Sequence, residues 1–248
     1  MAALRGDPPP IPADTPVRLY SMEYCPFAQR ARVALKAKGV KFDVINCNLK
    51  NKPKFLTDAH PNGQVPVLLH KGNVIVESEI IVEYVDQAFP DQGKTLYSED
   101  AATRAKARAH ITFFGQKVMP LMYKVTRDPT NEEEKANLLK MVEKWVEEPL
   151  SKGGAPFFGG QEYNAVDVNI WPWIERFDVM AQQGIISLAK DRFPALAAYV
   201  ERMKSVPAIA ETVHSAEDFK VFYDSYKKGE ALYNHNSPHP LYEGDSSA

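Results

Sequence analysis

The segment Ser21-Met22-Glu23-Tyr24-Cys25-Pro26-Phe27-Ala28-Gln29-Arg30 marks a change from strand to helix near the start of the folded chain. It follows Val17-Arg18-Leu19-Tyr20, whose alternation predicts a short strand. Pro26 to Lys38 then has apolar residues at helical spacing, and Gly39 suits the end of that helix. Pro26 fits the first helical position because its φ is already helical and its missing N–H is not needed there. Cys25 is therefore predicted at the N-cap.

A cysteine at a helix N-terminus is a candidate nucleophile. The positive helix end stabilises thiolate over thiol, and cysteines so placed have pKa values of about 3.5–7.5 instead of about 8.5. The alternative is that Cys25 is a small buried apolar residue. Ala28 stands three residues further on, so a C-x-x-C disulfide cannot form. Chemistry at Cys25 must then use a mixed disulfide with a small thiol, resolved by a second molecule of that thiol.

Composition limits the function classes. The chain has 248 residues, with Lys+Arg 30 against Asp+Glu 32, and this near-neutral balance argues against a nucleic-acid partner. No apolar run approaches the length of a membrane span, and the N-terminus lacks an apolar signal core, so we expect a cytoplasmic protein and no membrane association. Cys47 is the second of two cysteines. We expect it to be structural, and a disulfide with Cys25 is the alternative.

The rest of the N-terminal part predicts a small α/β layer. We expect a strand over 40–46, a helical turn near 52–56, a hairpin of 65–69 with 73–76, and a helix over 78–89. The order β-α-β-α-β-β-α, with Cys-Pro between the first strand and the first helix, indicates a thioredoxin-like domain over 17–92. Residues 1–16 contain five prolines and predict an extended arm.

From residue 98 to 248 the pattern changes to helical periodicity without a convincing strand, which predicts an all-helical C-terminal domain. Asn131, followed by three glutamates, has the form of an N-cap with an acidic first turn. The six histidines show no metal-ligand spacing, so we expect no metal site.

Three features near Cys25 suggest a peptide-like ligand. A cis bond before Pro66 would turn the N–H and C=O of Val65 outward to pair with a peptide. Ser78 is predicted to cap a helix that can hold a carboxylate, Glu77 can bind an ammonium group, and Lys52 adds a cation. The alternatives are a trans proline starting an edge strand, a plain helix cap and a solvated lysine. Together the groups suit glutathione.

The sequence resembles the glutathione transferases, and closely the omega class. The resemblance covers nearly the whole chain and is carried by an ordered set of motifs: Cys-Pro-Phe-Ala-Gln-Arg at 25–30, Asn-Leu-Lys-Asn-Lys-Pro at 48–53, Gln-Val-Pro-Val at 64–67 and Val-Glu-Ser at 76–78. It implies that Cys25 is the catalytic thiol, that glutathione is a co-substrate with no bound cofactor, and that the protein is a homodimer. It also implies that Pro66 is cis and that glutathione is bound by Phe27, Lys52, Val65, Pro66, Glu77 and Ser78.

The resemblance implies two further features of the helical domain. Asn164 and Asp167 look like the family's capping box at the start of a helix. An open pocket for a small oxidised or electrophilic acceptor would be lined by Phe114, Met122, Tyr123, Trp173, Tyr223 and Tyr226. The alternative for these residues is packing in the helical core.

The resemblance implies an enzyme: a glutathione transferase with thioltransferase activity, with dehydroascorbate and methylarsonate reduction and weak conjugation. One alternative is a protein like the chloride intracellular channels, which share the Cys-Pro-Phe motif. Those proteins carry a long acidic loop, whereas 150–161 here is short and has no acidic residue. A non-catalytic glutathione-binding or ligand-binding protein is the other alternative.

Overall fold

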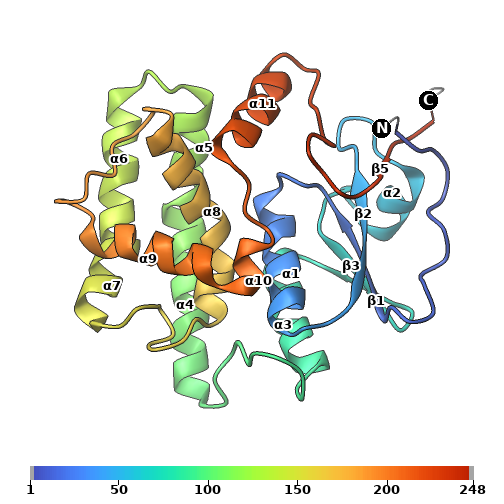
Figure 1. Ribbon diagram of the computed structural model, residues 1–248, viewed down its shortest axis with the longest axis horizontal. Helices are drawn as coiled ribbons and strands as arrows, with labels where there is room; N and C mark the ends of the chain where they lie inside the picture. Colours follow the sequence, from blue (N-terminus) through green and yellow to red (C-terminus); the bar gives the residue numbers. More distant parts are fainter. Residues whose placement is uncertain (1–2, 246–248) are drawn as a thin grey trace. The chain divides into compact units, whose positions relative to one another are not determined.

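The computed structural model describes residues 3–245, and contacts divide the chain into two compact units (Figure 1). The first unit is Met1–Lys94 together with His214–Ala248, and the second is Thr95–Val213. The helical domain predicted over 98–248 therefore differs from the second unit, because the segment from His214 onward belongs to the first unit. The outer ends of the predicted arm and of the predicted helical domain, residues 1, 2 and 246–248, lie outside the described residues.

The first unit contains a mixed sheet with the strand order β4-β3-β1-β2-β5. The first four strands are β1 (Val17–Ser21), β2 (Phe42–Cys47), β3 (Val67–His70) and β4 (Asn73–Val76). β1 runs parallel to β2 and antiparallel to β3, and β4 is antiparallel to β3. The predicted thioredoxin-like domain is thereby confirmed.

A fifth strand, β5 (Leu241–Tyr242), corrects the expectation that the C-terminal part contains no strand. It pairs in parallel with Asn46 and Cys47 at the end of β2. Leu4 of the N-terminal arm forms a bridge with Tyr242 on the other side. Because the strand has only two residues, no alternation in the sequence could reveal it.

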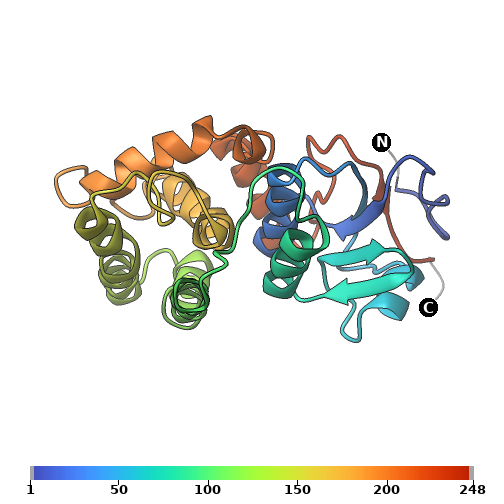
Figure 2. The same ribbon diagram turned by 90° about the horizontal axis from the view of Figure 1, so that it is seen from below.

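Helices cover both faces of this sheet (Figures 1 and 2). They are α1 (Pro26–Ala37), α2 (Lys54–Ala59) and α3 (Ser78–Ala88). The first unit also contains α11 (Ala216–Lys227), in its C-terminal segment. α1 and α3 pack against each other on one face, while α2 lies on the other. α1 and α3 each end one residue earlier than predicted.

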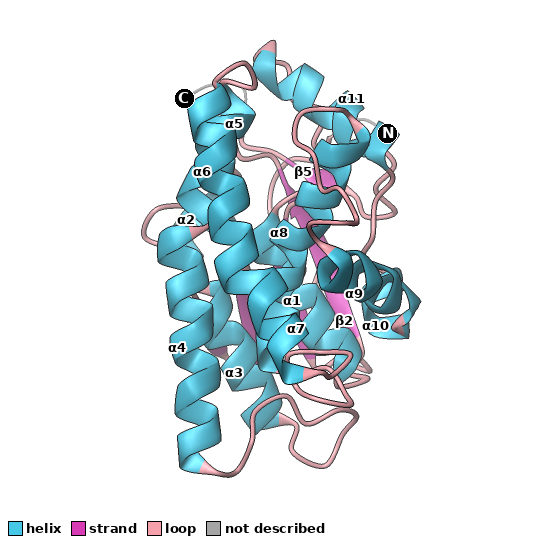
Figure 3. Ribbon diagram, turned by 90° about the vertical axis from the view of Figure 1, so that its left-hand side faces the viewer, coloured by secondary structure: helices cyan, strands magenta, loops and turns pink. Residues whose placement is uncertain are grey.

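The second unit is helical (Figure 3). Its elements are α4 (Ala101–Lys117), α5 (Met119–Arg127), α6 (Glu132–Val142), a π-helical turn (Glu143–Glu147), α7 (Glu148–Gly153), α8 (Ala165–Gln182), α9 (Pro194–Ser205) and α10 (Pro207–Ala210). α8 forms the core, and its Trp171 and Trp173 are fully buried. Within residues 3–245, no helix has the length and apolar character to cross a bilayer.

The two predicted helix caps of this unit are present. The Asn131 side chain accepts a hydrogen bond from the Glu134 N–H at 3.1 Å. At the start of α8, the Asp167 carboxylate accepts from the Asn164 N–H at 2.8 Å, and the capping box is complete. Burial raises the pKa of Asp167 to about 6, although its hydrogen bonds to backbone N–H groups act in the opposite direction.

Candidate functional site

Cys25 occupies the N-cap position of α1, as the sequence predicts. Its φ and ψ of −75° and 120° are extended, and Pro26 is the first residue of the helix. No acidic residue lies in the first turn of α1, so nothing there opposes the positive end of the helix dipole. The Cys25 side chain is only 8% exposed, but it lines a cavity.

The loop before Cys25 is held by two buried polar side chains that were not among the predicted site residues. Arg32 of α1 donates to the Ser21 hydroxyl at 3.0 Å and to the Glu23 carbonyl at 2.7 Å. Asn46 of β2 accepts from the Glu23 N–H at 3.1 Å. These bonds fix the path of the chain from β1 into α1, and therefore the position of the sulfur.

A cavity of about 430 Å³ brings together every residue assigned to glutathione by the sequence. Cys25 and Phe27 come from the start of α1, and Lys52 comes from the loop after β2. Val65 and Pro66 precede β3, and Glu77 and Ser78 stand at the junction of β4 with α3. Leu49, His60, Gly63 and Gln64 complete the lining.

The backbone N–H and C=O groups of Val65 are available to pair with an extended ligand. The Val65–Pro66 peptide bond is cis, as the resemblance implies. No hydrogen bond joins the backbone N–H or C=O of Val65 to another residue between 3 and 245. Val65 precedes β3 and lines the cavity, so a bound peptide can use both groups.

The helix cap at Glu77-Ser78 differs by one residue from the prediction. Glu77 is the N-cap of α3, and Ser78, predicted to be the cap, is the first helical residue. Glu77 has a φ of +67°, in the left-handed region that non-glycine residues rarely adopt. Such a conformation costs on the order of 1 kcal/mol or more and is found most often at functional sites. It brings the exposed Glu77 and the buried Ser78 to the same cavity.

Lys52 and Gly63 meet at the edge of the cavity. The Lys52 ammonium donates to the carbonyl of Asn62 at 2.8 Å. A Cβ on Gly63, whose φ is +55°, would lie 2.9 Å from Cδ of Lys52. Gly63 therefore leaves room for the lysine stem. The sequence signal for this role is the Asn62-Gly63 pair, typical of a turn that needs a positive φ.

The six residues predicted to line an acceptor pocket have different surroundings. In the second unit, Phe114, Met122 and Trp173 are buried, and Phe114 packs edge-on against Trp173 with ring centroids 6.4 Å apart. Tyr123 is 39% exposed and lies in the same unit. Tyr223 and Tyr226 belong to α11 in the first unit, where Tyr226 is 57% exposed. The acceptor pocket therefore stays a prediction.

Cys47 lies at the end of a strand, outside the cavity that Cys25 lines. It is fully buried at the end of β2, and burial raises the pKa of its thiol to about 12. Neither cysteine forms a disulfide in this structure. Across residues 3–245, no group of three or more histidine, cysteine or acidic side chains is arranged to hold a metal ion.

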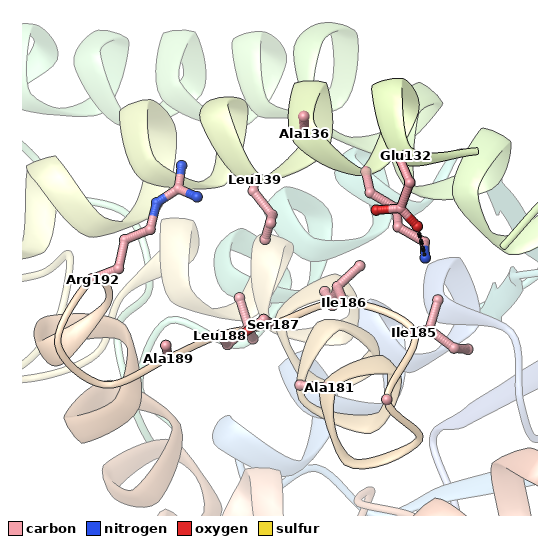
Figure 4. A pocket seen from close by; sticks show the side chains of 12 residues that line it. Glu132, Ala136, Leu139, Ala181, Ile185, Ile186, Ser187, Leu188, Ala189 and Arg192 are labelled. Carbon is pink, nitrogen blue, oxygen red and sulfur yellow. Dashed lines mark hydrogen bonds and ion pairs between the residues drawn. The ribbon is translucent and has the colours of Figure 1, made fainter. Parts of the chain in front are cut away.

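A larger cavity, of about 750 Å³, lies within the second unit between α6 and the chain that follows α8 (Figure 4). Its middle is apolar, with Leu139 and Ile186, and charged groups stand at its ends. Glu132 pairs with Lys135 at one end, and Arg192 stands at the other. None of the residues that line it is a cysteine or a histidine. The smaller cavity around Cys25 is therefore the candidate functional site.

Comparison with known proteins agrees with this geometry. Residues 19–93 match the glutathione S-transferase N-terminal domain, and residues 128–202 match the C-terminal domain. Glutathione S-transferase omega-1 of Sus scrofa is 36% identical over 94% of this chain and 93% of its own length. Pyrimidodiazepine synthase of Drosophila melanogaster is 34% identical over 93% of this chain and 94% of its own length. The structure of rice GST1 in complex with glutathione superposes with a TM-score of 0.76 at 30% identity, covering 87% of this chain and 99% of the rice chain.

A thioredoxin-like unit with a thiol at the start of its first helix, together with a helical unit, defines the class of fold. The chain belongs to the glutathione S-transferase family, and within it to the omega class.

Proposed function

We propose that this chain is a glutathione-dependent thioltransferase that works through a mixed disulfide at Cys25. The observation that carries the proposal is the position of Cys25 at the N-terminus of α1, in the same cavity as Lys52, Val65, Glu77 and Ser78. The free N–H groups and the dipole of a helix N-terminus stabilise a thiolate, which is the nucleophilic form.

The groups around the cavity match the parts of glutathione. Glutathione carries two carboxylates, one ammonium group and a peptide backbone. Lys52 and the N-terminus of α3 at Ser78 suit carboxylates, while Glu77 suits the ammonium group. The backbone of Val65 can pair with the peptide as an added strand. We propose that glutathione bound by these groups places its thiol beside Cys25, which lines the same cavity.

The reaction takes two steps of thiol–disulfide exchange. The Cys25 thiolate attacks the glutathionyl sulfur of an oxidised acceptor, the disulfide bond breaks, and the acceptor leaves as a thiolate that takes a proton. A second glutathione thiolate then attacks the mixed disulfide and releases Cys25 together with glutathione disulfide. Glutathione is thus a co-substrate, and no resident cofactor is needed. Dehydroascorbate and methylarsonate contain no disulfide. For them the Cys25 thiolate first bonds to the oxidised atom, one glutathione attacks the Cys25 sulfur to release the reduced product and form the same mixed disulfide, and a second glutathione releases Cys25 with glutathione disulfide, so two glutathiones supply the two electrons and two protons. This mixed-disulfide chemistry suits reduction better than conjugation, which needs the sulfur of glutathione itself as nucleophile.

Two further parts of the proposal come from the family. We propose a cytoplasmic homodimer, in keeping with the two-fold symmetry of most soluble oligomers. The acceptor is a small oxidised or electrophilic molecule. The similarity to a pyrimidodiazepine synthase makes a heterocyclic acceptor a candidate to assay beside the disulfides.

Intact mass after incubation with glutathione disulfide tests the proposal. We expect one glutathione adduct on the wild type and none on Cys25→Ser. Cys47→Ser is the matched control and should still carry one adduct, because the thiol it removes is buried in the wild type. Thioltransferase activity should disappear with the adduct. An adduct without turnover would favour a non-catalytic glutathione-binding protein, and conductance across liposomes would favour a channel-like relative. Wild-type activity in Cys25→Ser would overturn the proposed mechanism.

A further inference from the structure

Glu23 lies two residues before Cys25, and both its backbone and its side chain are held. Asn46 and Arg32 hold the backbone, as described above. The carboxylate, in contrast, is held from the C-terminal segment of the chain. Ser237 donates to one of its oxygens at 2.8 Å, and Nε2 of His214 lies 3.3 Å from the other.

The neighbouring Tyr24 is held by the same segment. Its hydroxyl donates to the carbonyl of His235 at 2.6 Å. Its ring stacks on Phe222, with centroids 4.5 Å apart, and contacts three further rings. We call the surrounding residues the C-terminal socket: His214, Phe219, Phe222, His235 and Ser237. Glu23 and Tyr24 are both more than 90% buried in it.

The socket is itself anchored to the sheet. Asn46, which accepts from the Glu23 N–H, also donates to the carbonyl of Tyr233 at 2.9 Å. Further along, β5 pairs with the end of β2. The segment from 214 to 242 is therefore fixed at several points and can hold the loop before Cys25 rigidly.

We propose that Glu23 is a positioning residue for Cys25, through which the C-terminal socket holds the sulfur at the start of α1. This inference deepens the proposed function, since it concerns the same thiol. It assigns the last part of the chain a role in the reactivity of a cysteine near the first strand.

The charge of Glu23 gives the contact its strength. Burial by itself raises the pKa of Glu23, but the close approach of His214, the charge of Arg32 and the hydrogen bond from Ser237 outweigh it and lower the pKa to about 2. The carboxylate is thus ionised at neutral pH. The charged and titratable groups around it are Tyr24, Arg32, His214 and His239, and His239 in turn interacts with Lys36 and Asp43.

Removing a hydrogen-bond donor from the Glu23 carboxylate affects the Cys25 thiol in two ways, and both act in the same direction. A buried negative charge with fewer partners is poorly compensated, so the loop that carries it shifts. Because Glu23 is two residues from Cys25 in the chain, the less compensated charge also disfavours the thiolate. Both effects raise the pKa of the Cys25 thiol and slow its reactions at pH values near and below that pKa.

The test is the pH profile of Cys25 alkylation by iodoacetamide, followed on the Cys25 peptide by mass. For Ser237→Ala and for His214→Leu we expect the midpoint to rise by about 0.5–1 pH unit. At a pH well below the wild-type midpoint, the rate should fall by about three- to tenfold, because there it follows the fraction of thiolate. Ser237→Thr keeps the hydroxyl and should restore the wild-type profile. In a Glu23→Gln background, Ser237→Ala should change the rate by less than about twofold, because both act through one carboxylate.

Glu147→Gln is the matched control. Glu147 is a buried glutamate of the second unit that accepts from the Ala195 and Leu196 N–H groups and from Ser151. Its loss perturbs the fold without touching the Cys25 loop, so the alkylation profile should not move. Wild-type profiles in both Ser237→Ala and His214→Leu, or an equal shift in Glu147→Gln, would overturn the inference. Iodoacetamide needs no glutathione, so failure of the proposed function would appear separately, as a wild type that alkylates but forms no glutathione adduct.

Discussion

Arg30 donates from Nη1 to the hydroxyl of Ser78 at 3.2 Å, which links the helix that starts after Cys25 to the helix that starts beside Glu77. The same nitrogen lies 3.1 Å from a carboxylate oxygen of Glu79. Arg30 is 1% exposed, so this link is internal. It sets the position of one wall of the cavity relative to the thiol on another.

Arg30→Met should weaken glutathione binding more than it slows the chemical step. The methionine fills space but leaves Ser78 and Glu79 without their donor, and the start of α3 is no longer held in place. We expect the KM for glutathione to rise by about tenfold, with a smaller change in kcat. Arg30→Lys replaces the forked guanidinium by a single ammonium group, so its KM for glutathione should lie between those of the wild type and Arg30→Met. Isothermal titration with glutathione checks this; an unchanged affinity in Arg30→Met would contradict it.

The φ of +67° at Glu77 leads to a paired prediction for Glu77→Gly and Glu77→Ala. Both variants lose the carboxylate, so both should bind glutathione more weakly and to a similar extent. Only the glycine relieves the backbone conformation, so it should be more stable than the alanine by about 1 kcal/mol. Urea denaturation and glutathione affinity, measured on both variants, test the two halves independently. Equal stabilities would show that the position carries no strain.

Most residues that line the cavity could be predicted because they lie in short motifs, and the residue types in such a motif indicate its local structure. Cys25-Pro26 is such a motif, since proline at the first helical position places the preceding residue at the cap. The cap at Glu77 could not be predicted to the residue. Nothing in the sequence indicates that a glutamate adopts a positive φ, and Ser78 is by residue type the better N-cap than Glu77.

Residues that act through distant partners were not predictable. Arg30, Arg32 and Glu23 are charged residues in or beside a helix, and by type they are expected to be solvated. The structure instead places Ser78 beside Arg30, Ser21 beside Arg32 and Ser237 beside Glu23. β5 is two residues long and has no pattern of its own. In the second unit, aromatic residues that line a pocket and those that fill a core share the same spacing, as buried Phe114 illustrates.

Gly93 is required where the chain leaves the sheet unit. Its φ is +52°, and a Cβ there would lie 2.4 Å from the carbonyl oxygen of Ala37 and 2.6 Å from the backbone of Lys38. Gly93→Ala should therefore destabilise the protein by about 3 kcal/mol or more, from backbone conformation and overlap together. Gly39 is the control, because its φ of +65° is similar but nothing lies within 4 Å of a Cβ. Gly39→Ala should cost about 1 kcal/mol. Equal losses in thermal unfolding would contradict the close contact.

Glu23 should make stability depend on pH in acid. Its pKa in the folded protein is about 2, below its ordinary value of 4.5. Between these two pH values the folded state therefore binds fewer protons than the unfolded state. The stabilisation is complete above about pH 4.5 and is lost as the pH falls toward 2, and it amounts to about 3 kcal/mol. Glu23→Gln should lack this contribution, so its free energy of unfolding should lie below the wild-type value at pH 6, and the gap should narrow as the pH falls. Ser237→Ala keeps the carboxylate with one donor fewer and should show an intermediate slope. Urea denaturation at several pH values between about 6 and 3 measures these free energies of unfolding. If the free energies of the wild type and Glu23→Gln fell in parallel with pH, the carboxylate would not be held as the structure describes.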